Sequence, residues 1–247
     1  MKSLVVLWAI VFAASAEDFH MKLNENGETF TEDVIVDLKE NTEEIKVPQH
    51  QDRAELDLLN DFNVGLSAMK LPISKKCYIS KIAPSEQKPA EMEQNMKLAK
   101  SKFPTQQYMV ETFKVLIVRK MMKTEVGTKI AAHCDGYDLL FTMRFNKENI
   151  EEEALKIVKN ARVDRLRARR DVAVTTFTTC NNESTKVAET CPPEKLGARC
   201  TFFRSDQRVC VYRITCQPTG GQSQGFANCV GNHRFDLMQC CDFRCMA

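Results

Sequence analysis

Apolar and polar residues alternate in the first part of the chain, which is the pattern of half-buried β-strands. The run from Phe19 to Leu23 and the run from Thr31 to Leu38 both alternate, and Asn26-Gly27 lies between them. Asn-Gly between two alternating runs is a strong signal for a β-hairpin. We therefore expect a small β-meander in residues 17–52, although this segment has eleven acidic residues against three lysines.

The spacing of apolar residues changes to a helical period after Ala54. Five of them recur at intervals of three or four positions: Leu56, Leu59, Phe62, Leu66 and Met69. This spacing predicts one face of a helix that ends near Pro72. Asp57 and Asp61 would lie on one side of that helix, because they are four residues apart.

Strands and helices are expected to alternate up to residue 168. Strands are predicted at Cys77 to Ile82, Tyr108 to Met121, Val126 to Cys134 and Tyr137 to Phe145. Helices are predicted at Ala90 to Lys102 and, with many charges, at Asn146 to Ala168. Helices mixed with mainly antiparallel strands make the expected fold class α+β.

The first sixteen residues have the form of a secretory signal peptide. Lys2 precedes an apolar run from Leu4 to Ala14, and small residues follow up to Ala16. Cleavage after Ala16 is expected, with an uncleaved anchor as the alternative. The run is too short for stable membrane insertion, which needs about 20 apolar residues. The net charge of +2 is nearly balanced, so no nucleic-acid partner is expected. We therefore expect a secreted, extracellular protein.

Eleven cysteines are present, and nine of them follow residue 179. These nine are Cys180, Cys191, Cys200, Cys210, Cys216, Cys229, Cys240, Cys241 and Cys245. In an oxidising compartment such crowding predicts a disulfide framework, whose connectivity the sequence does not give. Nine is an odd number, so one thiol is free, forms an intermolecular disulfide, or pairs with a cysteine outside this segment. Zinc is disfavoured because no Cys-X2-Cys pair occurs, and no metal or cofactor is expected.

A basic motif separates the charged helix from the cysteine-rich segment. Arg167, Arg169 and Arg170 form Arg-X-Arg-Arg, the sequence that furin-type convertases recognise through charge-assisted contacts. The motif ends the charged helix at 146–170, and cleavage after Arg170 would release a cysteine-rich peptide at 171–247. Asn182-Glu183-Ser184 is an N-glycosylation sequon within the cysteine-rich peptide. The alternative for the motif is a solvated helix end.

Residues 53–145 resemble a BRICHOS domain, a family marked by one aspartate and two cysteines. Asp61, Cys77 and Cys134 match these three positions, and the sequence around Asp61 and Cys77 is similar to that of the family. The resemblance implies a small, mainly antiparallel sheet with two helices, followed here by a small disulfide-rich module that contains β-strands. Cys77 is expected to pair with Cys134, since the other cysteines are distant. Asp61 is expected either to accept a hydrogen bond or pair with a lysine, or to act as a pH-dependent switch.

The resemblance also implies an activity, because BRICHOS domains are regarded as intramolecular chaperones for a β-prone segment of their own precursor. The client here would be the C-terminal segment, and its best strand runs from Arg208 to Cys216. The candidate client residues in this strand are Val209, Val211, Tyr212 and Ile214. An extended client would add to the edge or the face of a sheet.

These features predict a secreted proprotein whose BRICHOS domain assists a disulfide-rich peptide that a convertase then releases. One alternative is an unprocessed mucosal or matrix protein of gastrokine type, and another is a host-defence peptide precursor. No catalytic set is present, so an enzyme is not expected. The sequence leaves open whether the chain forms a homo-oligomer.

Overall fold

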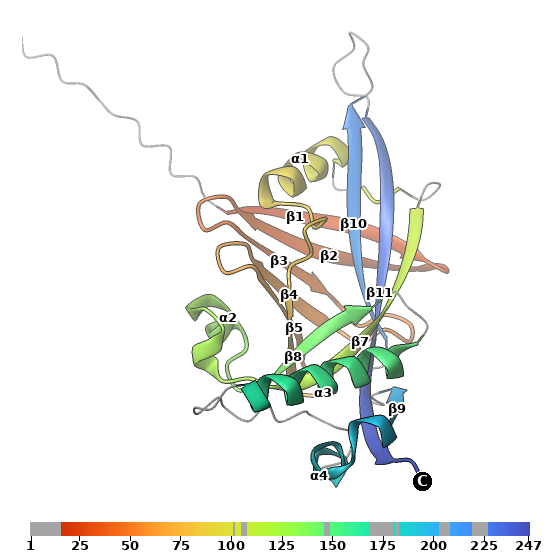
Figure 1. The fold of residues 1–247 in the computed structure, drawn as a ribbon. Helices are drawn as coiled ribbons and strands as arrows, with labels where there is room; N and C mark the ends of the chain where they lie inside the picture. The colour runs from red at the N-terminus through yellow and green to blue at the C-terminus, as the bar shows by residue number, and fades with distance from the viewer. Residues whose placement is uncertain are drawn as a thin grey trace, which may run out of the picture.

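The computed structural model describes residues 16–100, 102–104, 108–145, 149–167, 180, 183–202, 208–218 and 227–247. Within these ranges eleven strands form one sheet, with the order β1-β2-β3-β4-β5-β6-β8-β7-β11-β10 and β9 paired to β11. Helices lie around this sheet (Figure 1). The fold class is therefore α+β, as expected, with a sheet much larger than the small one that the resemblance implied.

The first six strands form a continuous antiparallel meander. They are β1 (Glu17–Glu25), β2 (Glu28–Asp37), β3 (Thr42–Val47), β4 (Leu56–Asp61), β5 (Leu66–Leu71) and β6 (Lys76–Lys81). Asn26 and Gly27 join the first two strands with φ angles of 50° and 88°, the left-handed conformation that a tight hairpin turn requires. The meander expected in residues 17–52 is confirmed, and it continues without a break through β6.

The helix expected from Ala54 to Pro72 is wrong, because the chain forms β4 and β5 there. Leu58 lies opposite Met69 in this antiparallel pair. Both faces of the two strands are mostly buried, so apolar residues occur on both faces and their spacing imitates a helical period. Gly65, with a φ of 69°, turns the chain between the strands.

The strand expected from Val126 to Cys134 is also wrong. The segment forms a short helix, α2 (Thr128–His133), and a 3-10 turn, η1 (Lys123–Glu125), precedes it. Val126, Ile130 and Cys134 are four residues apart and fully buried, which is the spacing of one helix face. The other expected elements of this region are present as α1 (Pro89–Ala99), β7 (Tyr108–Lys120), β8 (Asp138–Phe145) and α3 (Ile150–Arg167).

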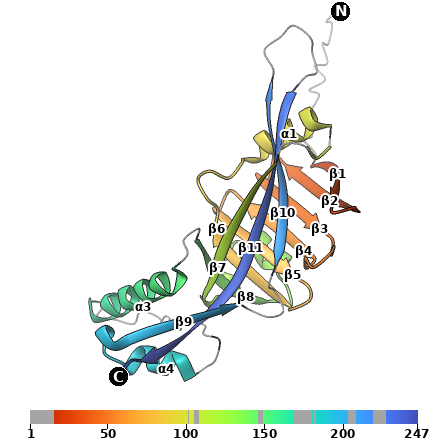
Figure 2. The same ribbon diagram turned by 90° about the vertical axis from the view of Figure 1, so that its right-hand side faces the viewer.

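The C-terminal segment adds further elements to the same sheet. They are α4 (Glu183–Thr190), η2 (Pro193–Lys195), β9 (Leu196–Phe202), β10 (Val209–Pro218) and β11 (Ala227–Cys245). β11 pairs in parallel with β7 and antiparallel with β10 and β9. Figure 2 shows the long strands β7, β11 and β10 crossing the meander, while β9, α3 and α4 gather near the C-terminus.

Alternate residues of the meander face two different cores. Leu58, Met69 and Tyr78 belong to the main core, which also contains residues of β10. Their neighbours Leu59, Ala68, Cys77 and Ile79 belong to a smaller core with α2. Because neighbouring residues of a strand point to opposite faces, α2 covers one face of the meander and β10 covers the other.

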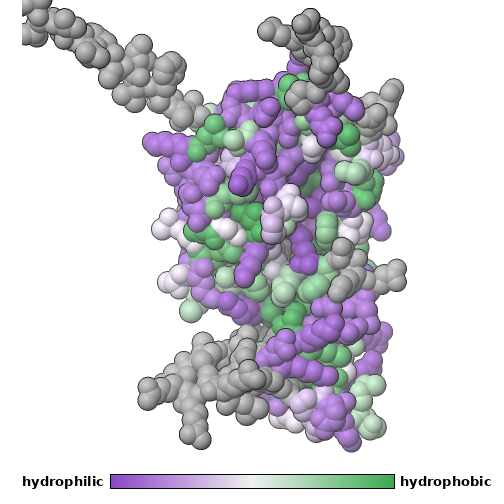
Figure 3. Space-filling view, turned by 45° about the horizontal axis from the view of Figure 1, so that its top comes forward, coloured by the Kyte–Doolittle hydropathy of each residue, from purple (hydrophilic) through white to green (hydrophobic). Residues whose placement is uncertain are grey.

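The surface is mixed in character. On the face shown in Figure 3, hydrophilic residues cover most of the area, and hydrophobic residues gather in small patches between them. Within the described ranges, no helix combines the length and the apolar character needed to cross a bilayer. Five disulfides join ten of the eleven cysteines and indicate an oxidising compartment.

Candidate functional site

The candidate site is the surface on which β10 lies. Residues 17–167 are called the N-terminal part here, and residues 171–247 are called the tail. The four candidate client residues of β10 are almost fully buried: Val209 is 0%, Val211 1%, Tyr212 1% and Ile214 0% exposed. They share one core with β1 to β5 and with α1. Odd-numbered and even-numbered residues of a strand point to opposite faces, and both sets are buried here, so both faces of β10 are covered.

The outer edge of β10 is also covered, although β10 ends the strand order of the sheet. Side chains of the N-terminal part meet its outward-pointing backbone groups at every second residue. The N–H of Tyr212 donates to Glu32 Oε2 at 3.2 Å, and the N–H of Cys216 donates to Asn95 Oδ1 at 3.0 Å. Between them, the carbonyl of Ile214 accepts from Gln87 at 3.1 Å. These contacts satisfy groups that would otherwise attract another strand.

Tyr212 makes a second kind of contact through its side chain. Its hydroxyl lies 2.7 Å from His50 Nε2 and donates to Glu25 Oε2, also at 2.7 Å. His50 Nδ1 donates to the carbonyl of Pro48 at 2.8 Å, which fixes the orientation of the ring. Burial raises the pKa of Tyr212, so the hydroxyl stays protonated and remains a donor.

Aromatic rings surround this hydroxyl network. The ring of Phe103 lies 5.9 Å from that of Tyr212 and 5.1 Å from that of His233, measured between centroids. Phe103 also packs onto Gly231 of β11, where an added Cβ would overlap the ring. The N-terminal part therefore contacts both strands of the β10–β11 hairpin, and Gly231 allows the close approach.

A largely buried charge cluster lies on the same interface. The N-terminal part contributes Glu43, Glu86 and Arg144, and the tail contributes Arg213, Arg234 and Asp236. Glu86 lies 2.8 Å from Arg213 and 3.2 Å from Arg234, and Arg144 lies 3.0 Å from Asp236. Three carboxyl groups thus face three guanidinium groups, and the pairs join the two parts. The three arginines line a cleft of about 480 Å³.

Burial and these partners shift the pKa values of the acidic groups in different directions. Burial alone would raise the pKa of Glu86, but the guanidinium groups of Arg213 and Arg234 outweigh it and lower the pKa. Burial raises the pKa of Glu43 in spite of Arg213. Burial raises the pKa of Glu32 to about 8, so this carboxyl is largely protonated at neutral pH.

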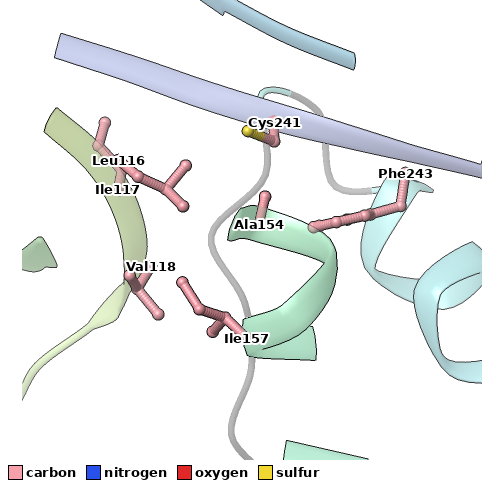
Figure 4. A pocket seen from close by; sticks show the side chains of 7 residues that line it. All are labelled: Leu116, Ile117, Val118, Ala154, Ile157, Cys241 and Phe243. Carbon is pink, nitrogen blue, oxygen red and sulfur yellow. The ribbon is translucent and has the colours of Figure 1, made fainter. Parts of the chain in front are cut away.

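A second apolar contact joins the two parts near the C-terminus. Side chains of β7, α3 and β11 point toward one another around a gap of about 10 Å³ (Figure 4). They are Leu116, Ile117, Val118, Ala154, Ile157, Cys241 and Phe243. The core they belong to also contains Ala188 and Leu196 of the tail. The charged helix α3 therefore packs its apolar stripe on the tail.

Four disulfides lie wholly within the tail: Cys180–Cys240, Cys191–Cys245, Cys200–Cys241 and Cys216–Cys229. The last two join residues that lie opposite each other in neighbouring strands. Cys210, in β10, is the unpaired cysteine and is buried. Burial raises the pKa of its thiol to about 12, which makes the thiol unreactive.

Cys77 and Cys134 lie on the face of the meander that α2 covers, and Asp61 lies near Gly127, just before α2. Cys77 and Cys134 form the expected disulfide, which fixes α2 on the meander. Asp61 is at the end of β4 rather than in a helix; its Oδ1 accepts the N–H of Asn63 at 3.0 Å and its carbonyl accepts that of Gly65 at 2.9 Å. The three residues therefore support the far face of the meander, and Asp61 shapes the turn that follows β4.

Potential metal ligands come together at one place in the described chain. Glu44, Asp57 and His133 each offer an atom within 4.8 Å of the others. Lys46 lies 3.0 Å from Glu44, and Lys70 lies 2.7 Å from Asp57. Burial lowers the pKa of His133, so its ring is neutral. The two lysines already balance the two carboxylates, which makes this an ion-pair cluster rather than a cation site.

Several contacts of the site were not predicted from the sequence, among them Glu25, Glu32, His50, Gln87 and Asn95. Glu32 carried a usable signal, because it shares its face of β2 with Phe30, Val34 and Val36. A carboxylate on an otherwise apolar strand face is a candidate for a specific role. The other four contacts depend on residues brought together from distant elements.

Residues 1–15 of the expected signal peptide, Arg169, Arg170 and the sequon residue Asn182 lie outside the described residues, and α3 ends at Arg167. No protein-family model matches the chain, and neither a curated protein nor a solved structure is significantly similar to it.

Proposed function

We propose that the protein is a secreted proprotein whose N-terminal part, a BRICHOS-like domain, is an intramolecular chaperone for the cysteine-rich tail. The observation that carries this proposal is the coverage of β10. Side chains of the N-terminal part cover both faces of the strand and meet Tyr212, Ile214 and Cys216 at its outer edge.

The chemistry of β10 explains why the tail would need such a partner. Alone, the strand would expose Val209, Val211 and Ile214 together with an unpaired edge, which is the signature of an aggregation-prone segment. It also carries the free thiol of Cys210, which would compete with correct disulfide pairing. Binding to the N-terminal part hides the apolar residues and the thiol together.

Processing is the second part of the proposal. A furin-type convertase cuts after Arg170, and secretion places the products outside the cell. Two observations support this order. Arg-X-Arg-Arg separates the BRICHOS-like residues from the cysteine cluster, and the four tail disulfides all lie on one side of it. Because the tail disulfides join only residues of the tail, a single cut breaks its covalent connection to the N-terminal part.

Mass spectrometry of the secreted material tests the processing step. We expect a fragment that begins at Asp171, and we expect the variant Arg170→Ala to be secreted as a single chain. A wholly intact wild-type chain would overturn the processing step. The chaperone step has its own test: residues 17–170 should delay aggregation of a peptide spanning Arg208 to Cys216, and no delay at equimolar ratio would count against it.

An unprocessed extracellular binding protein of gastrokine type is the second candidate. The observation that favours it is the continuity of the sheet, since β11 lies between β7 and β10. In that case the tail is a permanent part of the fold. Retention of residues 165–170 in the mature protein would support this candidate over the proprotein.

A further inference from the structure

We infer that the convertase product is a two-chain, non-covalent complex, in which residues 17–170 continue to hold the tail. This inference rests on the proposed processing after Arg170. It adds that cleavage and separation are different steps, so that the N-terminal part is the binding partner of the mature tail as well as the helper of its folding.

The distribution of disulfides shows that nothing covalent would hold the two parts after a cut. All eleven cysteines lie among the described residues. Cys77–Cys134 lies in the N-terminal part, the other four disulfides lie in the tail, and Cys210 is unpaired. One broken peptide bond between the two parts therefore makes two separate chains.

Strand pairing would hold these two chains together. β11 pairs with β7 in a parallel register of nine residues, from Gly231 opposite Tyr108 to Gln239 opposite Leu116. Among the described strands, β10 pairs only with β11, so the hairpin would have to leave as a unit. Its departure would leave nine residues of β7 without their partner.

Apolar burial opposes separation as well. Val209, Val211, Ile214 and Met238 of the tail are each 0–1% exposed and lie in the main core of the N-terminal part. Separation would expose apolar side chains of this core to water on the N-terminal part and on the tail. The second apolar contact, between α3 and Phe243, would open with it.

The polar contacts across the interface are buried and specific. The hydroxyl of Tyr212 contacts Glu25 and His50. Nη2 and Nε of Arg144 lie 3.0 and 3.1 Å from Oδ2 of Asp236, which accepts from them. Separation would leave buried charges and donors on both sides without partners until water replaced them. A cut after Arg170 removes none of these contacts, because it lies outside all of them.

The direct experiment cuts the purified full chain with a furin-type convertase. On a non-reducing denaturing gel we expect two fragments, because no disulfide joins them. In native size-exclusion chromatography we expect both fragments in one peak at the position of the uncut protein. Elution of the tail in a later peak of its own would overturn the inference.

A second full-length chain separates this inference from the processing proposal. Residues 172–178 are replaced by the recognition sequence of a site-specific protease, and that protease makes the cut. If the convertase fails to cut the wild-type chain, the processing proposal fails. Co-elution of the fragments cut by the site-specific protease would still support the inference, and their separation would refute it.

An interface variant tests which contacts retain the tail. Asp236→Asn keeps the size of the side chain but removes the charge that holds Arg144. We expect the cut variant to release its tail at least about tenfold faster than the cut wild type. Asp138→Asn, which changes an exposed carboxylate of the N-terminal part, is the matched control and should release at the wild-type rate. Equal rates for Asp236→Asn and wild type would contradict the assigned interface.

Discussion

The hydroxyl of Tyr212 lies 2.7 Å from Nε2 of His50, a residue 162 positions earlier in the chain. The same hydroxyl donates to Glu25 at the end of β1. A single tail side chain is thus held by two groups of the N-terminal part, and both Tyr212 and His50 are almost fully buried. The contact is specific to the hydroxyl, whereas apolar packing alone would accept any large side chain.

Tyr212→Phe should therefore destabilise the protein although it keeps the ring. The change leaves the buried His50 and the partly buried Glu25 without their shared partner, which costs about 1–3 kcal/mol. The free energy of unfolding, measured by urea denaturation of the uncut chain, checks this.

The matched control for that measurement is Tyr137→Phe, which alters a tyrosine packed beside the α2 core, far from β10. The control should change the free energy of unfolding less than Tyr212→Phe does. Equal effects of the two substitutions would show that the bridge to His50 and Glu25 does not stabilise the interface.

Glu32 predicts a distinct dependence of stability on pH. Its pKa is raised by burial from 4.5 to about 8 in the folded protein. The folded state therefore binds the extra proton between these values, and this contribution to stability is lost as the pH rises from about 4.5 through about 8. Glu32→Gln keeps an acceptor for the N–H of Tyr212 and removes the titration. We expect the variant to be more stable than wild type at pH 8.5 and nearly equal at pH 5, by denaturant unfolding at each pH. Parallel pH profiles would contradict this.

Glu86 predicts the opposite sign. Its pKa is lowered because Arg213 and Arg234 outweigh the effect of burial. Its contribution to stability is present above pH 4.5 and is lost as the pH falls through the lower, folded value. Glu86→Gln should cost about 3 kcal/mol at pH 7, because it removes the carboxylate that lies 2.8 Å from Arg213 and 3.2 Å from Arg234, two buried guanidinium groups. The cost should shrink at pH 3. Glu55→Gln, at an exposed position, is the control, and a cost independent of pH would refute the ion-pair account.

Cys210 provides a chemical probe of the interface. Its thiol is buried with a pKa of about 12, so little thiolate is present at pH 8. We expect a thiol reagent to label the native chain on the order of a thousandfold more slowly than the urea-unfolded chain. Cys210→Ser should abolish the signal, which confirms the site of labelling. Rapid stoichiometric labelling of the native protein would show that β10 is not covered.

The sequence predicted several elements in which one face is buried and the other is exposed. β1 and β2 alternate cleanly, and the helix α3 has a single apolar stripe, so both followed from their periodicity. β4 and β5 are mostly buried on both faces, and there the apolar spacing of Leu56, Leu59 and Met69 gave a false helix. The turn signal Asn63-Val64-Gly65 was the local feature that should have outweighed it.

The interface itself was only partly predictable. The strand Val209 to Ile214 and the pairing of Cys77 with Cys134 could be read from the sequence. The position of β11 between β7 and β10 could not, because long-range pairing depends on the whole fold rather than on local pattern. The contacts of His50 and Glu25 with Tyr212 depend on that pairing, so the sequence could not predict them either.

The central claim, that the N-terminal part assists the tail, is tested most directly by supplying the two as separate chains. The tail, residues 171–247, is expressed behind the first sixteen residues, with or without residues 1–170 on a second gene. We predict that the tail alone is retained or aggregated, and that co-expression restores secretion with four disulfides and a free Cys210. The double variant Gln87→Ala and Asn95→Ala in residues 1–170, which removes two side chains from the edge of β10, should rescue less. Secretion of equal amounts of correctly oxidised tail in the absence of the N-terminal part would contradict the claim.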